Sequence, residues 1–257
     1  MIENKKDFIS FVKSLPKSIP QFKSVFDIPV KGANDEPMFL EQFRGKVLIF
    51  VNTTGHCGNI PQWPIIDKIQ EEYKNKNVQV IYTPTNDYCG SVTYGSYKKG
   101  ISHASESVEF AKKTYGIEGV FTELLSSRNE VWKHKYDELK NGEWKHDKEL
   151  LEKAESEVQP PKSDLFSFLV PEIEEPIHGN FTKFITNQDG FPVARFADGI
   201  FLDIEHSIKK GIILRPEEEL SNFKKVLDEV LSTGLCTNPR YGYYPYDIFK
   251  NIDEAIE

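Results

Sequence analysis

Apolar residues along the chain fall into two patterns, continuous short runs and runs with helical spacing. Residues 46–52 and 78–84 are continuous runs rich in Val and Ile, which is typical of strands covered on both faces. After the first run, residues 61–73 place their apolar side chains along one stripe of a helix. After the second, residues 105–117 have the same spacing, and Ser105 is a candidate N-cap. These segments predict two parallel strands joined by a helix, followed by a second helix.

Two hairpins and a long helix complete the pattern. Residues 22–46 alternate around a Gly-Ala-Asn-Asp turn and residues 180–196 around a Gln-Asp-Gly turn, so each segment predicts a β-hairpin. Residues 215–234 predict a helix with Pro216 and three glutamates at its start and a glycine after its end. The whole pattern is α/β, with a parallel and an antiparallel pair in one sheet. It predicts a thioredoxin-like fold, in which helices flank a central mixed β-sheet.

The 257 residues are expected to form a single thioredoxin-like domain, residues 1–257, with three additions to its core. Residues 1–20 predict an N-terminal helical extension. Residues 128–160 are rich in charges of both signs and predict a charged helical insertion outside the main core. Residues 235–257 form a C-terminal extension that is rich in aromatic residues and prolines, and we expect it to pack on the domain surface.

Composition and charge exclude several classes of protein. Hydrophobic residues make up 39% of the chain, enough for a packed core. The formal net charge is −8 and Lys and Arg are not gathered into a basic patch, so we expect no nucleic-acid partner. No apolar run approaches the roughly 18 residues of a membrane span, and the first residues lack the apolar stretch of a signal peptide. A cytoplasmic protein that does not associate with membranes is expected.

The three cysteines, Cys57, Cys89 and Cys236, agree with a reducing compartment. Their odd number and wide spacing do not suit a disulfide framework. Since no Cys-x-x-Cys is present, the sequence predicts neither a zinc site of that type nor a dithiol redox loop. Exchange of disulfides between proteins is therefore disfavoured.

Cys57 is the main candidate for chemistry, because it stands between a buried strand and the start of a helix. One interpretation is a small buried side chain, which is the common fate of a free cysteine. The other is a reactive thiolate favoured by the positive end of the helix dipole. His56 adjoins the cysteine and is expected to face solvent, while His178 is a second candidate hydrogen-bond donor.

Three segments of the sequence resemble the glutathione peroxidase family. FRGKVLIFVNTTGHCGNIPQW (residues 43–63) is similar to the family's segment around the reactive cysteine. IYTPTNDYCG (81–90) is similar to its F-P-x-N-Q-F-G loop, and GNFTKFITNQDGFPVARF (179–196) to its W-N-F-x-K-F hairpin. The matching positions are Gly45, Lys46, Val47, Asn52, Cys57, Gly58, Gln62, Pro84, Asn86, Asn180, Phe181, Lys183, Phe184, Gly190, Arg195 and Phe196.

The resemblance implies an active site built from a cysteine or selenocysteine, a glutamine, a tryptophan and an asparagine. Cys57 and Asn180 match two of these positions. Asp87 stands at the glutamine position and Gly179 at the tryptophan position, so two neutral N–H donors are replaced. An ionised Asp87 beside Cys57 would disfavour the thiolate by like-charge repulsion. The catalytic candidates are therefore Cys57, Asn180, Asp87 and Cys89.

The resemblance also implies a thiol-dependent peroxidase that protects against oxidative stress. Its substrate would be hydrogen peroxide or an organic hydroperoxide, and its reductant a thiol, either glutathione or a thioredoxin-like protein. No metal or organic cofactor is implied. Cys89 is either a resolving cysteine that forms a disulfide with oxidised Cys57 or an incidental loop thiol. The alternative function is a catalytically weakened relative that acts as a binding or redox-sensing module.

Overall fold

The computed structural model describes the core of the predicted domain. The described residues are 22–55, 57–87, 101–127, 141, 146–155, 162–170, 177, 179–199, 201, 216–238 and 240–242. Among these residues, no helix combines the length and the apolar character that crossing a membrane requires.

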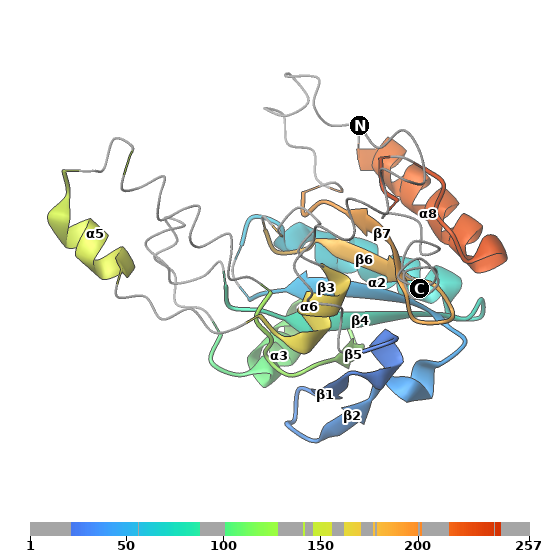
Figure 1. The fold of residues 1–257 in the computed structure, drawn as a ribbon, viewed down its shortest axis with the longest axis horizontal. Helices are drawn as coiled ribbons and strands as arrows, with labels where there is room; N and C mark the ends of the chain where they lie inside the picture. Colours follow the sequence, from blue (N-terminus) through green and yellow to red (C-terminus); the bar gives the residue numbers. More distant parts are fainter. Residues whose placement is uncertain are drawn as a thin grey trace, which may run out of the picture.

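A five-stranded mixed sheet forms the centre of the molecule, in the order β5-β4-β3-β6-β7 (Figure 1). Its strands are β3 (Val47–Thr53), β4 (Val78–Pro84), β5 (Val120–Phe121), β6 (Lys183–Thr186) and β7 (Pro192–Phe196). β4 pairs in parallel with both β3 and β5, whereas β6 pairs antiparallel with both β3 and β7. The two parallel strands and the antiparallel hairpin therefore share one sheet, and the fold is α/β and thioredoxin-like, as predicted.

The helices of the core are α2 (Trp63–Tyr73), α3 (Ala104–Tyr115), α6 (Asp164–Leu169) and α8 (Pro216–Thr233). α2 connects β3 to β4, which confirms the predicted crossover, and α8 ends before Gly234, which has a positive φ of 74°. Short 3-10 helices cover Val25–Asp27 (η1), Leu40–Phe43 (η2) and Ile60–Gln62 (η3). The first predicted hairpin is present as β1 (Pro29–Lys31) paired with β2 (Pro37–Phe39).

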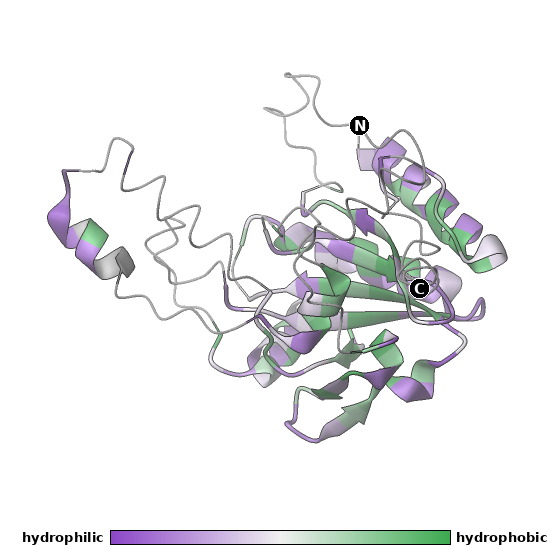
Figure 2. Ribbon diagram, viewed as in Figure 1, coloured by the Kyte–Doolittle hydropathy of each residue, from purple (hydrophilic) through white to green (hydrophobic). Residues whose placement is uncertain are grey.

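Both faces of the sheet are covered, which explains why β3 is a continuous apolar run. Val47, Ile49 and Val51 pack into one hydrophobic cluster with side chains of α2 and α8. Leu48 and Phe50 point the other way, into a second cluster that includes α6. Since side chains alternate along a strand, covering both faces requires every position to be apolar. Figure 2 shows hydrophobic residues concentrated in the central strands and alternating with hydrophilic ones along α8.

The strand register brings four connecting segments to one edge of the sheet. Thr53 pairs with Pro84, so β3 and β4 end together. Lys183 pairs with both Val51 and Phe196, so β6 begins, and β7 ends, at this same edge. The segments that follow β3, β4 and β7 therefore meet the segment that precedes β6. Ligand sites in open α/β sheets gather at the carboxyl ends of the parallel strands, and this is that edge.

The start of α3 corrects one detail of the sequence analysis. The helix begins at Ala104, so Ser105 lies inside its first turn and is not the N-cap. Glu106 takes the capping role instead, because its Oε1 accepts hydrogen bonds from the backbone N–H groups of Ser102 and His103 at 2.7 and 3.0 Å. A carboxylate in the first turn satisfies N–H groups that have no partner within the helix.

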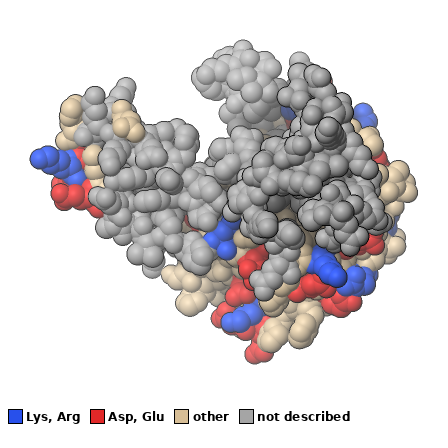
Figure 3. Space-filling view, in the orientation of Figure 1, with Lys and Arg blue, Asp and Glu red and all other residues tan. Residues whose placement is uncertain are grey.

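Of the three predicted additions, residues 1–20 lie outside the described residues, and so does most of 128–160. The described part of the insertion contains a helix, α5 (Lys148–Glu155), which stands apart from the sheet in Figure 1. The described surface shown in Figure 3 carries Lys and Arg interspersed with Asp and Glu.

The beginning of the C-terminal extension packs against the sheet rather than only on its surface. Tyr241 is buried and its ring stacks on Phe196 with centroids 4.2 Å apart. The backbone N–H of Arg195 donates to the carbonyl of Tyr241 at 2.8 Å, and Gly242 forms a β-bridge with Ala194. The extension thus covers the edge strand β7, which would otherwise present unpaired backbone groups.

Candidate active site

Cys57 lies in the segment between β3 and η3, at the sheet edge where the four connections meet. Its side chain is half-buried and packs partly against the cluster that α2 covers. The sulfur accepts a hydrogen bond from the backbone N–H of Asn59 at 3.3 Å. This N–H belongs to the first turn before η3 and α2, where backbone N–H groups and the helix dipole favour negative charge. Cys57 thus combines a hydrogen-bond donor to its sulfur with partial exposure, two features that favour a reactive thiolate.

Asn180 is linked to Cys57 through Asn59, and its side-chain amide has a fixed orientation. Its side-chain oxygen accepts hydrogen bonds from Thr85 Oγ1 at 2.8 Å and from Asn52 Nδ2 at 3.5 Å. Its backbone carbonyl accepts a hydrogen bond from Asn59 Nδ2 at 2.9 Å. Since the oxygen of the amide is held by Thr85 and Asn52, the amide nitrogen is the group left to act as a donor in the site. The structure thus brings Asn180 and Cys57 together through Asn59.

Asn52 anchors the turn that carries Asn180. Its Oδ1 accepts from the N–H of Thr182 at 2.8 Å, its Nδ2 donates to the carbonyl of Gly179 at 3.2 Å, and its own carbonyl accepts from the N–H of Phe181 at 2.6 Å. Phe181 has a positive φ of 71°, an unusual conformation for a bulky residue, and these bonds hold it there. No role was predicted for Asn52 from the sequence; the available signal was a polar side chain within a buried, largely apolar strand.

Asp87 is buried at the same edge, and its carboxylate is held by two serines. Oδ1 accepts from Ser126 Oγ at 3.1 Å, while Oδ2 accepts from the N–H and the Oγ of Ser127 at 2.6 and 2.7 Å. These donors come from the segment after β5 and stabilise the charged form of the carboxylate. The structure therefore shows Asp87 fixing this loop, a contact that the sequence analysis did not foresee.

The side chain of Asp198, which follows β7, lies directly against Gly179. A Cβ atom at position 179 would lie 2.3 Å from Asp198 Oδ2, so the carboxylate fills the space that a side chain there would need. Asp198 Oδ2 also accepts from Asn59 Nδ2 at 3.2 Å. The position that the family resemblance assigns to tryptophan is thus occupied by a carboxylate from another strand end. Asp198 had no role in the sequence analysis, and no motif would have revealed it.

A buried lysine holds the backbone around Asp198. Lys183 is fully buried, and its Nζ donates to Gln62 Oε1 and to the carbonyls of Ala197 and Asp198, the last two at 3.4 and 3.2 Å. Gln62 Nε2 donates to the same Asp198 carbonyl at 2.5 Å. Burial lowers the pKa of Lys183 well below its usual value, against the opposing effects of the Asp198 and Glu219 carboxylates. The lysine therefore ties the start of β6 and the start of α2 to the end of β7.

Some candidates from the sequence analysis lie outside the described residues, namely Cys89, His56 and His178. Cys236 follows α8, is half-buried, and has a pKa raised above the usual value mainly by burial. A raised pKa disfavours the thiolate, so Cys236 has the opposite environment to a reactive cysteine.

Comparison with known proteins finds similarity to glutathione peroxidases. The family model described as glutathione peroxidase matches residues 25–119. A probable phospholipid hydroperoxide glutathione peroxidase of Mesembryanthemum crystallinum is 28% identical over 200 residues, covering 76% of this chain and 96% of the relative. A glutathione peroxidase homolog, BsaA, of Staphylococcus epidermidis is 27% identical over 179 residues, covering 68% and 89%.

Among solved structures, the crystal structure of T. cruzi GPX1 aligns with a TM-score of 0.42 and 18% identity, covering 73% of this chain and 94% of that chain. The thioredoxin-like assignment rests on the sheet order above. The sheet order shows a thioredoxin-like fold, and the relatives are thiol peroxidases. More particularly, the family model and the relatives support a divergent relative of the glutathione peroxidase family.

Proposed function

We propose that this protein reduces hydroperoxides with Cys57 as the peroxidatic residue. The observation that carries the proposal is the hydrogen bond from the Asn59 N–H to the Cys57 sulfur at the start of the η3–α2 segment. It combines with the half-exposed position of the side chain and with Asn180 nearby. A thiolate, an accessible path and neighbouring N–H donors are the requirements for attack on a peroxide.

The reaction follows from this arrangement. The Cys57 thiolate attacks the terminal oxygen of the hydroperoxide, so an S–O bond forms and the O–O bond breaks. The leaving alkoxide or hydroxide takes up a proton and departs as an alcohol or as water. Cys57 becomes a sulfenic acid, oxidised by two electrons, and the hydroperoxide is reduced by two electrons. The Asn59 N–H and the Asn180 amide would stabilise the charge on the sulfur and the oxygen as it moves.

Reduction then requires two thiols. The first attacks the sulfenic sulfur, releases water and forms a disulfide with Cys57, and the second attacks that disulfide, restores the Cys57 thiol and is left in a disulfide with the first. Where the first thiol is Cys89, a further external thiol must release Cys89 from that second disulfide. The first thiol is either Cys89 or an external reductant such as glutathione or a thioredoxin-like protein. Neither route needs a metal or an organic cofactor.

The decisive experiment is mass spectrometry of the intact protein after one equivalent of hydrogen peroxide. The wild type is compared with Cys57→Ser, Cys89→Ser and, as a matched control cysteine, Cys236→Ser. Rapid loss of two hydrogens that depends on both Cys57 and Cys89 would identify a two-cysteine peroxidase. Rapid addition of one oxygen at Cys57 alone would identify a one-cysteine enzyme. If Cys57 is modified no faster than Cys236, the proposal is wrong.

The same oxidised sample identifies the reductant. Glutathione and a reduced thioredoxin-like protein are added separately, and the return to the mass of the reduced chain is followed over time. The physiological class of reductant is expected to restore that mass much faster than the other. An oxidised form that neither thiol restores would contradict a catalytic cycle and favour a sensing role.

A further inference from the structure

The close fit between Gly179 and Asp198 is a feature that the proposed reaction does not yet explain. A Cβ atom at 179 would meet Asp198 at 2.3 Å from Oδ2 and 2.9 Å from Cγ. The backbone of Gly179 does not have the positive φ that would demand glycine. The glycine is therefore required by its neighbour, the Asp198 carboxylate, rather than by its own conformation.

The Asp198 carboxylate reaches Cys57 through a single residue. Asn59 Nδ2 donates to Asp198 Oδ2 at 3.2 Å and to the carbonyl of Asn180 at 2.9 Å. The backbone N–H of the same Asn59 donates to the Cys57 sulfur at 3.3 Å. Both side-chain hydrogens of the Asn59 amide thus serve to fix the residue whose backbone contacts the reactive sulfur.

The backbone carbonyl of Asp198 is itself held in position by buried groups. The Asp198 carbonyl accepts from Gln62 Nε2 and from Lys183 Nζ, at 2.5 and 3.2 Å, and both of these side chains are fully buried. Leaving a buried polar group without a hydrogen-bond partner costs free energy. These hydrogen bonds therefore fix the position of the Asp198 backbone. The carboxylate therefore projects from a fixed point toward Asn59.

We propose that Asp198 is a positioning residue for Cys57: its carboxylate holds the Asn59 side chain, and with it the Asn59 N–H, in the geometry that stabilises the thiolate. The proposal rests on the peroxidatic role of Cys57 proposed above. Asp198 touches neither the sulfur nor the hydroperoxide in this role. Asp198 contributes a hydrogen-bond acceptor to Asn59. Its negative charge is not needed for this role, and like-charge repulsion from it disfavours the Cys57 thiolate.

A positioning role predicts different effects for two substitutions of Asp198. Asp198→Asn keeps an acceptor oxygen of the same shape and removes the charge, so the geometry at Asn59 is retained. Asp198→Ala removes the acceptor, so Asn59 keeps only its bond to Asn180. Rescue by the asparagine is not expected if Asp198 acts as a base or as a charge.

Gly179→Ala tests the same contact by adding atoms. The new methyl group enters the space of Asp198 Oδ2 and pushes the carboxylate away from Asn59. In a protein that already carries Asp198→Ala, the methyl group meets no carboxylate and should have no further effect. The two substitutions are therefore expected to be non-additive, as for groups that act through one contact.

The experiment uses the full chain with Cys89→Ser and Cys236→Ser, so that Cys57 is the one remaining thiol. The rates of Cys57 oxidation by hydrogen peroxide and of Cys57 alkylation by iodoacetamide are measured separately. We expect Asp198→Ala and Gly179→Ala each to slow both reactions about fivefold, the factor that corresponds to one lost hydrogen bond. The reference is the chain that carries only Cys89→Ser and Cys236→Ser. Both rates in Asp198→Asn should stay within about twofold of the reference rates, as should those in the exposed control Asp189→Ala.

Three results would overturn the inference: an unchanged rate in Asp198→Ala, a rate in Asp198→Asn as low as in Asp198→Ala, or effects of Gly179→Ala and Asp198→Ala that multiply. Thermal unfolding of each variant identifies any loss of fold, and if Gly179→Ala is unfolded the two Asp198 variants decide alone. Failure of the proposed function looks different. In that case the reference reacts slowly with peroxide, while alkylation of Cys57 still tests the role of Asp198.

Discussion

The side chain of Asn52 in the central strand β3 accepts a hydrogen bond from the backbone N–H of Thr182, 2.8 Å away. This contact joins the strand that leads to Cys57 with the turn that carries Asn180. Because the turn contains Phe181 at a positive φ, it needs bonds of this kind to keep its shape. Asn52 thereby determines the geometry between the two residues that the family resemblance places in the active site.

Replacing Asn52 by Ala should therefore weaken both the fold and the site. The Thr182 N–H would lose its partner inside the protein, and the Gly179 carbonyl would keep only the hydrogen bond from Thr182 Oγ1. We expect the free energy of unfolding, measured by urea denaturation, to fall by about 2–4 kcal/mol. The oxidation rate of Cys57 should fall as well, because Asn180 loses its support. Asn34→Ala in the exposed β1–β2 turn is the matched control. Equal stability of the two variants would contradict the anchoring role.

The serines around Asp87 lead to a second prediction. Asp87→Asn replaces one carboxylate oxygen by an NH₂ group, which cannot accept hydrogen bonds from Ser126 or Ser127. The free energy of unfolding is expected to fall by about 1–3 kcal/mol. The exposed Asp189→Asn should change it by less than about 0.5 kcal/mol. A stability unchanged by Asp87→Asn would show that the buried carboxylate is not needed for the loop.

The same substitution separates two roles of Asp87. Like-charge repulsion between Asp87 and Cys57 predicts faster alkylation of Cys57 once the charge is removed. A role confined to holding Ser126 and Ser127 predicts no acceleration. Measuring the alkylation rate of Cys57 in Asp87→Asn at one fixed pH distinguishes the two.

The fold could be predicted from sequence because its signals are local. The apolar runs of β3 and β4, the helical stripe of α2 and the turn of the β6–β7 hairpin each follow from spacing within a few residues. Cys57 and Asn180 were found through motifs that retain their order along the chain. The role of Asp198 was not predictable, since it depends on a contact with position 179 across the sheet. The same holds for Lys183, whose position in an apolar hairpin strand gave no hint of its partner Gln62.

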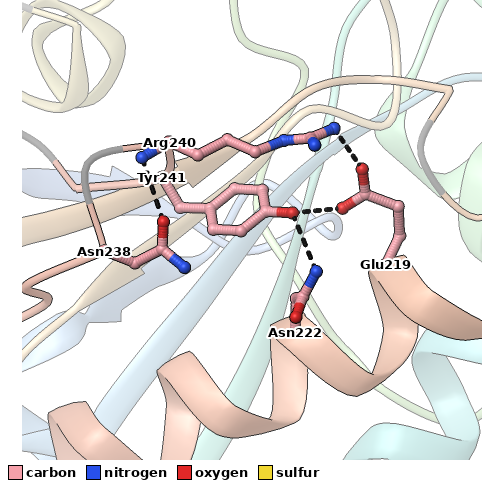
Figure 4. Close-up of polar contacts among 5 residues, drawn as sticks. All are labelled: Glu219, Asn222, Asn238, Arg240 and Tyr241. Atoms are coloured by element: carbon pink, nitrogen blue, oxygen red, sulfur yellow. Dashed lines mark hydrogen bonds and ion pairs between the residues drawn. The ribbon is translucent and has the colours of Figure 1, made fainter. Parts of the chain in front are cut away.

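Tyr241 and Glu219 fasten the C-terminal extension to α8 (Figure 4). Tyr241 Oη donates to Glu219 Oε2 at 2.5 Å, and Arg240 donates to Glu219 Oε1 at 2.5 Å. Burial and the Glu219 carboxylate raise the pKa of Tyr241 to about 12. Because the protonated phenol is favoured in the folded state, its contribution to stability is complete below about pH 10 and is lost as the pH rises toward about 12.

Tyr241→Phe should remove this contribution. At neutral pH we expect the free energy of unfolding to fall by about 1–2 kcal/mol, since Glu219 is left with a missing donor. Between about pH 10 and 12 the stability of the wild type should approach that of the variant. Tyr115→Phe, which retains the ring and removes a hydroxyl on α3, is the matched control. A difference between wild type and Tyr241→Phe that stays constant over this range would contradict the shifted pKa.

The contribution of Lys183 to stability should depend on pH in the opposite sense to that of Tyr241. Burial lowers its pKa, so the neutral amine is favoured in the folded state and folding opposes protonation. Its contribution to stability is therefore present above the usual lysine pKa of about 10.4 and decreases as the pH falls toward the lowered value. Lys183→Met removes the titrating group while keeping a side chain of similar length. Relative to the wild type, the variant should gain stability as the pH falls from about 10 to neutral.

The same variant tests whether Lys183 matters for the site. Its amine bonds to Gln62 and to the Ala197 and Asp198 carbonyls are lost in Lys183→Met, so the end of β7 is held less firmly. We expect Cys57 to be oxidised more slowly at every pH in this range, even where the variant is the more stable protein. The exposed Lys113→Met is the control for both measurements. Rapid oxidation of Cys57 in a stable Lys183→Met protein would show that the lysine serves the fold alone.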